Sequence, residues 1–158
     1  MNPRYAENTQ VSSEKSRAEI ERTLSRYGAS GFMYGWNQNS AVVVFQAYSR
    51  QVKFILEMPD RNNRDFTHTP SRGTKRSSAQ IEAAYEQCVR QRWRALALVI
   101  KAKLEAVESG ITCFEDEFMA HIVLPSGETV GGWLRPQIEK AYSTGHMPKL
   151  LPTLPGGE

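Results

Sequence analysis

The segment FMYGWNQNSAVVVFQAYSRQVKFILEMP, residues 32–59, decides the fold of this chain. Aromatic and β-branched residues occur in it with a period of two, which sends neighbouring side chains to opposite faces of a strand. Turn-forming residues interrupt the alternation at 37–40 and at 49–50, and Pro59 ends it because proline has no N–H to donate. The segment therefore predicts an antiparallel meander with one buried face. Its three strands are expected over residues 32–36, 41–48 and 52–58.

Helical periodicity flanks this meander on both sides. Upstream, a thin apolar stripe ends at Gly28, and the pattern Ser16-x-x-Glu19 is a capping box, although the helix could begin at Ser13. Downstream, Ser77-x-x-Gln80 opens the longest periodic segment. Its apolar residues recur every three or four positions, which is typical of the core-facing side of a helix, and the pattern ends at Gly110.

Two shorter helices are expected after Gly110. Thr112-x-x-Glu115 caps the first, and the second carries Trp133 and Tyr142, with Pro136 tolerated only in its first turn. The order predicts an α+β fold with an N-terminal helix, a three-stranded antiparallel meander, a long helix and two shorter C-terminal helices packed on one side. The expected organisation is a flexible arm, a single domain and a Pro/Gly-rich tail, over residues 1–12, 13–145 and 146–158.

The composition predicts a cytoplasmic protein. The 158 residues fit one domain with a substantial core. The N-terminus has no apolar segment typical of a signal peptide, and the longest apolar run, residues 95–100, is far shorter than a membrane span. Cys88 and Cys113 are interpreted as thiols of a reduced protein, and we expect no membrane association.

Positive charge is concentrated in the middle of the chain. Residues 50–103 hold twelve Lys and Arg against five Asp and Glu, whereas the residues that follow hold three against eight. A basic segment of this kind attracts polyanions. Residues 59–76 lie within this basic segment. They are predicted to form a long loop that binds phosphates and becomes ordered on binding. Simple solvation of the same charges is the alternative interpretation.

Basic residues of this segment and two aromatic residues are the candidates for nucleic-acid binding. Rings at alternate positions of the first strand can stack on unpaired bases, although such alternation is more often the core face of a sheet. A stacking platform there should lie near Arg50 and Lys53. The candidates are Tyr34, Trp36, Arg50, Lys53, Arg61, Arg64, Arg72, Lys75, Arg76, Arg90 and Arg94.

Catalysis has little support in the sequence. It contains no G-x-S-x-G element and no P-loop. Glu117 and His121 are four residues apart and could share a metal ion, but a second ligand pair is missing, so a structural hydrogen bond is the commoner role. We therefore predict no catalytic residue, no metal ion and no cofactor, and an enzyme is the least supported class.

The segments 32–59 and RWRALALVIKAKLEAVESGITCFEDEFMAHIVLP (92–125), with the closing MPKLLP (147–152), resemble a family of small bacteriophage and prophage proteins. The resemblance covers about Arg17 to Pro152. It implies a phage protein in the cytoplasm of a bacterial host, and it brings no activity to transfer. In element order alone, the chain is similar to phage single-strand-annealing proteins, whose cores combine a β-meander with a long basic helix.

Together these features predict a non-enzymatic phage or prophage protein that binds single-stranded DNA or RNA during replication or recombination. A homo-oligomer is expected if the acidic C-terminal third meets the basic middle of a neighbour in a head-to-tail ring. Two alternatives stay open. One is an interaction module that inhibits or redirects a host defence complex, and the other is a sponge for an anionic nucleotide, which needs a compact pocket rather than an open groove.

Overall fold

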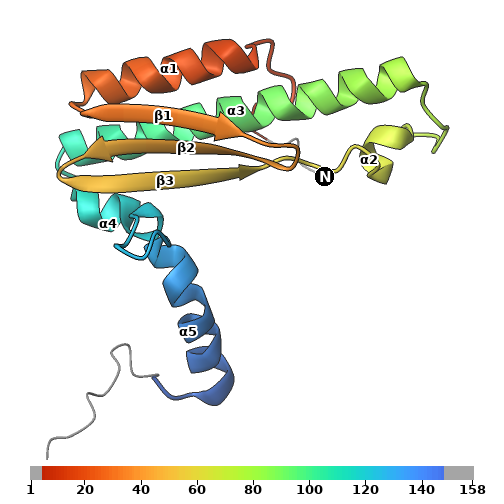
Figure 1. Cartoon of the computed structure of the whole chain (residues 1–158). Helices are drawn as coiled ribbons and strands as arrows, with labels where there is room; N and C mark the ends of the chain where they lie inside the picture. Colours follow the sequence, from red (N-terminus) through yellow and green to blue (C-terminus); the bar gives the residue numbers. More distant parts are fainter. Residues whose placement is uncertain (1–4, 148–158) are drawn as a thin grey trace, which may run out of the picture.

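The structure is a computed structural model that describes residues 5–147, so most of the predicted C-terminal tail lies outside the described residues. The predicted α+β class is confirmed, with helices and strands in the expected order (Figure 1). The elements are α1 (Ser13–Arg26), β1 (Gly31–Trp36), β2 (Ser40–Ala47), β3 (Arg50–Glu57), α2 (Arg64–Thr67), α3 (Ser78–Glu108), α4 (Phe114–Phe118), the 3₁₀ helix η1 (Met119–His121) and α5 (Val130–Thr144).

The three strands form one antiparallel sheet in the order β1-β2-β3. Trp36 of β1 lies opposite Ala41 of β2, at the end of the sheet far from the β2–β3 turn. That turn consists of Tyr48 and Ser49, both with positive φ, so Arg50 is the first residue of β3 and not part of the turn as predicted. Two residues with positive φ make a type I′ turn, whose twist matches that of the flanking strands.

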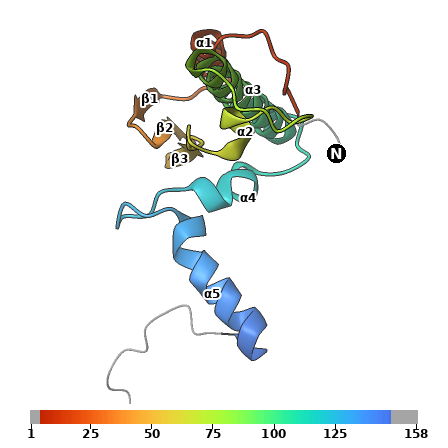
Figure 2. The same ribbon diagram turned by 90° about the vertical axis from the view of Figure 1, so that its right-hand side faces the viewer.

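One face of the sheet packs against α1 and α3, which lie on the same side of the strands in Figure 2. Alternate residues of β2 and β3 point into this core, as the period of two predicted. The core is continuous from α1 through the sheet to α3 and α4. Its fully buried large side chains include Ile20, Leu24, Val43, Phe45, Val52, Ile100 and Phe118.

One predicted helix cap is confirmed and two are wrong. Ser77 and Gln80 form the reciprocal capping box at the start of α3. The capping box expected at Ser16 is wrong, because Ser16 lies inside α1 and is fully buried; the alternative start at Ser13 is confirmed, with Ser12 as the N-cap. Cys113, and not Thr112, is the N-cap of α4, and no side chain caps that helix.

Helix α5 extends away from the sheet (Figures 1 and 2). None of its residues is buried, and Trp133, Ile138 and Tyr142 are exposed. Pro136 lies in the second turn and not in the first as predicted, because the helix already begins at Val130. Proline there removes one hydrogen bond from the helix interior.

The residues between η1 and α5 cover part of the outer edge of β3. Ile122 forms an antiparallel bridge with Val52, and the N–H of Val123 donates to the carbonyl of Gln51 over 2.8 Å. Lys53 Nζ donates to the carbonyl of Gly127, which lies in the turn before α5. This part of the sheet edge is therefore paired within the chain.

His121 is a half-buried titratable group in this region. Its ring stacks on Phe54, with 4.0 Å between the ring centroids. Burial is the main cause that lowers the pKa of His121, and the charge of Lys103 adds to it. The folded protein therefore favours the neutral ring.

The free energy of unfolding should consequently fall as the pH drops from about 7 to about 5. The unfolded chain takes up a proton on His121 near pH 6.5, whereas the folded chain resists doing so, and stability is lost until the lower folded pKa is passed. Urea unfolding at several pH values measures this. In His121→Phe, which keeps a ring against Phe54, the decrease should be smaller, and an unchanged decrease would assign the effect to other groups.

Candidate nucleic-acid interface

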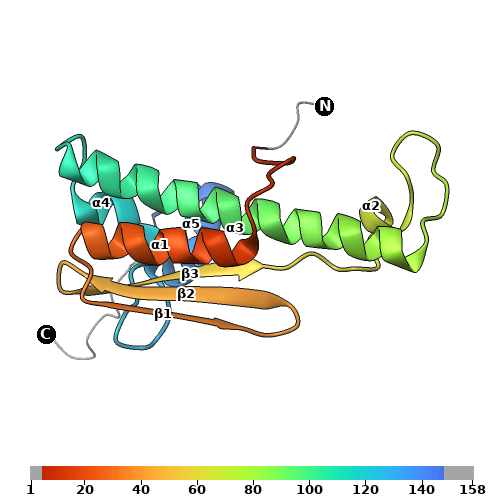
Figure 3. The same cartoon turned by 90° about the horizontal axis from the view of Figure 1, so that it is seen from above.

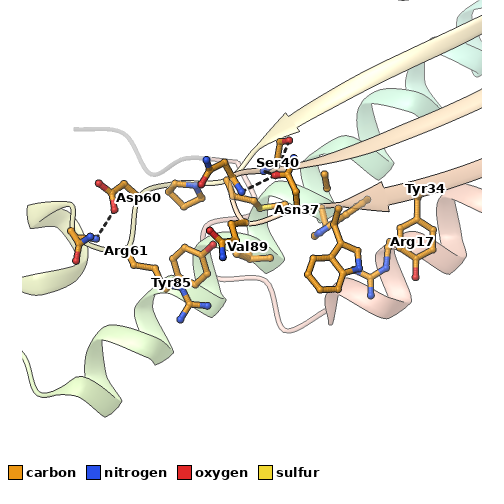
Figure 4. Close-up of a pocket in the computed structure, with 16 residues that line it drawn as sticks. Arg17, Tyr34, Asn37, Ser40, Asp60, Arg61, Tyr85 and Val89 are labelled. Carbon is orange, nitrogen blue, oxygen red and sulfur yellow. Dashed lines mark hydrogen bonds between the residues drawn. The ribbon is translucent and has the colours of Figure 1, made fainter.

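A cleft of about 1030 Å³ lies where the β1–β2 turn, the segment after β3 and the N-terminal half of α3 meet (Figure 4). Four aromatic side chains line it, and they come from β1 and α3: Tyr34, Trp36, Tyr85 and Trp93. Side-chain amides of the turn and of the segment after β3 line it as well: Asn37, Gln38, Asn39 and Asn62. The cleft therefore combines stacking surfaces with hydrogen-bonding groups.

The wall formed by β1 changes from core to open surface along the strand. Phe32 is partly buried and packs against the core, Tyr34 is 45% exposed, and Trp36 is 79% exposed. Figure 3 shows the reason, because the β1–β2 hairpin projects past the N-terminal end of α1. The last ring of the strand therefore faces the cleft without a helix over it.

Two arginines lie against the aromatic rings. The guanidinium carbon of Arg17 is 5.2 Å from the Tyr34 ring centroid and 5.1 Å from that of Trp93, so it bridges the two rings. The same carbon of Arg61 is 4.2 Å from the ring centroid of Tyr85. Such contacts attract because the ring face is electronegative.

Both of these arginines also have a carboxylate partner. Arg17 pairs with Glu14 over 3.4 Å, and Arg61 pairs with Glu82. Asp60 adds a further carboxylate to the lining. The cleft itself is therefore close to electrically neutral, and its positive surroundings must come from elsewhere.

The β1–β2 turn is held in a defined shape. Asn37 Oδ1 accepts hydrogen bonds from the backbone N–H groups of Asn39 and Ser40, each over 2.8 Å. This is the local pairing by which asparagine stabilises turns, and it confirms the turn predicted at 37–40. The cleft therefore has one rigid rim.

Residues 59–76, predicted as one long loop, contain the short helix α2. Asn63 caps it, and Phe66 is buried with its ring 5.8 Å from that of Tyr85. Arg76 holds the segment together, because its guanidinium donates to the carbonyls of Asp65 and Phe66 over 3.2 Å. The segment is thus tied to α3 next to the cleft.

The structure brings some of the predicted binding residues together. Tyr34, Trp36 and Arg61 all line the cleft. Arg64, Arg72 and Lys75 are exposed on the segment that continues from the cleft past α2. Among the residues that the structure describes, none of these three has a carboxylate within salt-bridge distance.

Other candidates are not among the residues that line the cleft. Arg94 forms a salt bridge with Glu19 between α3 and α1, and Arg90 donates to the side chain of Gln87. Arg50 begins β3 at the end of the sheet opposite to Trp36. Lys53 lies on the sheet face that points away from the core, where it contacts Gly127. The structure therefore does not place Arg50 and Lys53 beside the aromatic residues.

Three residues that make the ring and cation contacts of the cleft were not among the predicted candidates: Arg17, Tyr85 and Trp93. The sequence pattern places Arg17 only within the first helix, and it predicts that Tyr85 and Trp93 belong to the core-facing stripe of the long helix. Tyr85 does have little exposed surface, but its ring carries Arg61 at the edge of the cleft. The sequence feature that could have indicated a cleft at these residues is the length of α3, which far exceeds that of the strands that it covers.

Glu117 and His121 each contact another side chain of the fold. Glu117 forms a salt bridge with Lys103 over 2.9 Å, and His121 stacks on Phe54. Between residues 5 and 147, no group of three or more His, Cys, Asp and Glu could hold a metal ion. Over the same range, no helix is both long and apolar enough to cross a membrane.

Comparison of the chain with known protein families, with curated protein sequences and with solved structures finds no match.

Proposed function

We propose that the chain binds single-stranded nucleic acid, with unpaired bases in the cleft and phosphates on the basic segment beside it. The observation that carries the proposal is the exposed indole of Trp36 on the cleft wall, next to the partly exposed ring of Tyr34. Stacking of a base on an aromatic side chain contributes about 1–3 kcal/mol and needs no particular sequence. Amide side chains on the same rim are suited to hydrogen bonds with base edges.

The distribution of charge also supports the binding of single-stranded nucleic acid. The cleft is nearly neutral, whereas the exposed cations Arg64, Arg72 and Lys75 follow it along the chain. Phosphates stay solvated and attract cations, while bases prefer stacking surfaces. A strand could therefore lie with its bases in the cleft and its backbone along residues 64–75.

The size of the cleft favours a strand over a free mononucleotide. Its volume of about 1030 Å³ is at the upper end of the range of small-molecule pockets, roughly 300–1,000 Å³. A sponge for one nucleotide would need a compact pocket. The phage origin, which the sequence resemblance implies, and a role in replication or recombination both belong to this proposal.

Fluorescence anisotropy with a labelled single strand tests the proposal. We expect roughly micromolar binding at about 50 mM salt that weakens strongly at about 200 mM. Trp36→Ala should lower the affinity about tenfold or more through lost stacking, with little change in salt dependence. Trp133→Ala, which removes an indole from α5, is the matched control and should bind like the wild type. No binding at low salt, or an equal loss in both variants, would refute the proposal.

A protein-interaction module is the second candidate function, and α5 favours it. The helix has no buried residue and exposes Trp133, Ile138 and Tyr142. Clusters of exposed apolar side chains often mark interaction sites. A host protein that bound the chain while polynucleotide did not would favour this candidate.

A further inference from the structure

Strand β1 is an edge of the sheet, and its outer backbone groups are unpaired within residues 5–147. The N–H of Asn37 donates to the carbonyl of Ser40 over 2.8 Å, so the two residues form a hydrogen-bonded pair of the ladder. Because such pairs alternate, the N–H and C=O groups of Phe32, Tyr34 and Trp36 point away from β2. Among the described residues, no backbone group outside the sheet bonds to these three.

The two edges of the sheet differ in their protection. Ile122 and Val123 pair with part of the β3 edge, but nothing comparable covers β1 in the described chain. The sequence of β1, GFMYGW, contains no charged residue and no proline, the usual means of keeping an edge strand single. An uncharged strand with free N–H and C=O groups is suited to pairing with another strand.

We propose that β1 pairs with β1 of a second copy of this chain, antiparallel about a two-fold axis at Tyr34. In this register Tyr34 lies opposite Tyr34 of the second copy, and Phe32 lies opposite Trp36. All three residues with outward-pointing backbone groups then form hydrogen-bonded pairs. The two sheets join into one continuous sheet through an isologous contact.

Self-complementary side chains favour a second copy over an unrelated strand. The same register places Met33 opposite Gly35 of the second copy, on the sheet face away from α1 and α3. Met33 is 62% exposed, and a Cβ built on Gly35 has nothing within 4 Å. The strand thus carries a protruding side chain and the space to receive it at symmetric positions about Tyr34. Side chains come closest at this kind of non-hydrogen-bonded pair.

The interface is small, so the dimer should be reversible. Five residues of each copy, residues 32–36, form the strand contact, far fewer than the 20–30 residues a side of a standard interface. We therefore expect a dissociation constant in roughly the micromolar range. Since Tyr34 and Trp36 line the cleft, pairing also places two clefts on one surface. Only this consequence rests on the proposed function, and the pairing itself does not.

Sedimentation velocity from about 1 to 200 μM protein, without nucleic acid, tests the pairing. The wild type should shift from monomer to dimer with concentration. The double variant Met33→Lys/Gly35→Lys should stay monomeric, because the register puts like charges opposite each other. Ile55→Lys is the control, since Ile55 is 59% exposed on the same sheet face but on β3, and it should still dimerise.

A charge swap identifies the register. Met33→Lys combined with Gly35→Glu places opposite charges across the axis at both positions, so dimerisation should return. Circular dichroism checks that each variant is folded, and the room around Gly35 favours this.

A wild type that is monomeric throughout overturns the proposal, as does a dimer that survives the lysine pair or is lost in Ile55→Lys. Nucleic-acid binding by a strictly monomeric protein would leave the proposed function intact and remove the pairing alone.

Discussion

Replacing Phe118 with alanine is expected to lower the free energy of unfolding by about 3–5 kcal/mol. The side chain is 0% exposed, and its ring lies edge-on to Phe45 and Phe54, with centroids 5.8 and 6.4 Å away. It also stacks on Phe114, 4.7 Å away. Truncation would remove the contacts of three rings and leave a cavity that the rigid sheet cannot close. Urea denaturation measures the loss.

The neighbouring residue provides the control. Met119 is 45% exposed, so Met119→Ala should change the free energy of unfolding by no more than about 0.5 kcal/mol. Phe118→Leu keeps most of the apolar volume and should cost less than Phe118→Ala. If Phe118→Ala cost less than about 1 kcal/mol, α4 would not belong to the cooperative core. Hydrogen exchange should then show that the N–H of Val123, bonded to β3, opens independently.

The strands were predictable because their pattern reports burial directly. Each core position of β2 and β3 is apolar, and a shift by one residue would expose Val43 and Phe45 to water. The β2–β3 turn was misplaced by one residue for a local reason. Tyr48 adopts φ of 51°, and an aromatic residue with positive φ gives no turn signal in a sequence.

Helix starts were less predictable because several serines compete. Ser12, Ser13 and Ser16 can each act as N-cap, and a cap contributes only about 1 kcal/mol. Tertiary packing decides between them. Ser16 lies one turn before the buried Ile20, so it belongs to the core-facing stripe and is itself buried.

The cleft follows from a difference in length that the sequence contains. The 31 residues of α3 span about 46 Å, whereas the eight residues of β3 span about 26 Å. The helix must therefore extend beyond the sheet, whereas the β1–β2 hairpin projects past the N-terminal end of α1, which leaves Trp36 exposed in the cleft between the hairpin and α3 (Figure 3). Ion pairs between residues far apart in the sequence could not be predicted from the sequence. Arg94 pairs with Glu19, and the two are 75 residues apart.

Replacing Arg64, Arg72 and Lys75 together with alanine is expected to weaken single-strand binding about 100-fold at roughly 50 mM salt. These side chains are exposed, and no carboxylate lies within salt-bridge distance of them in the described chain. Each is therefore free to replace a counterion on a phosphate. Loss of three such contacts should lower the slope of log K against log salt by about 2, because one contact to a single strand contributes about 0.7. Anisotropy titrations at several salt concentrations give both quantities.

A second triple variant separates position from charge. Arg22, Lys101 and Arg135 are exposed on α1, α3 and α5, so their replacement by alanine removes the same total charge. At about 100 mM salt, charges more than about 10 Å from the strand are largely screened. This variant should therefore lose less than about threefold in affinity and keep its salt slope. Equal losses in the two variants would mean that binding follows net charge and that residues 64–75 have no special role. A loss confined to the first variant would place the phosphates beside α2, next to the uncovered ring of Trp36.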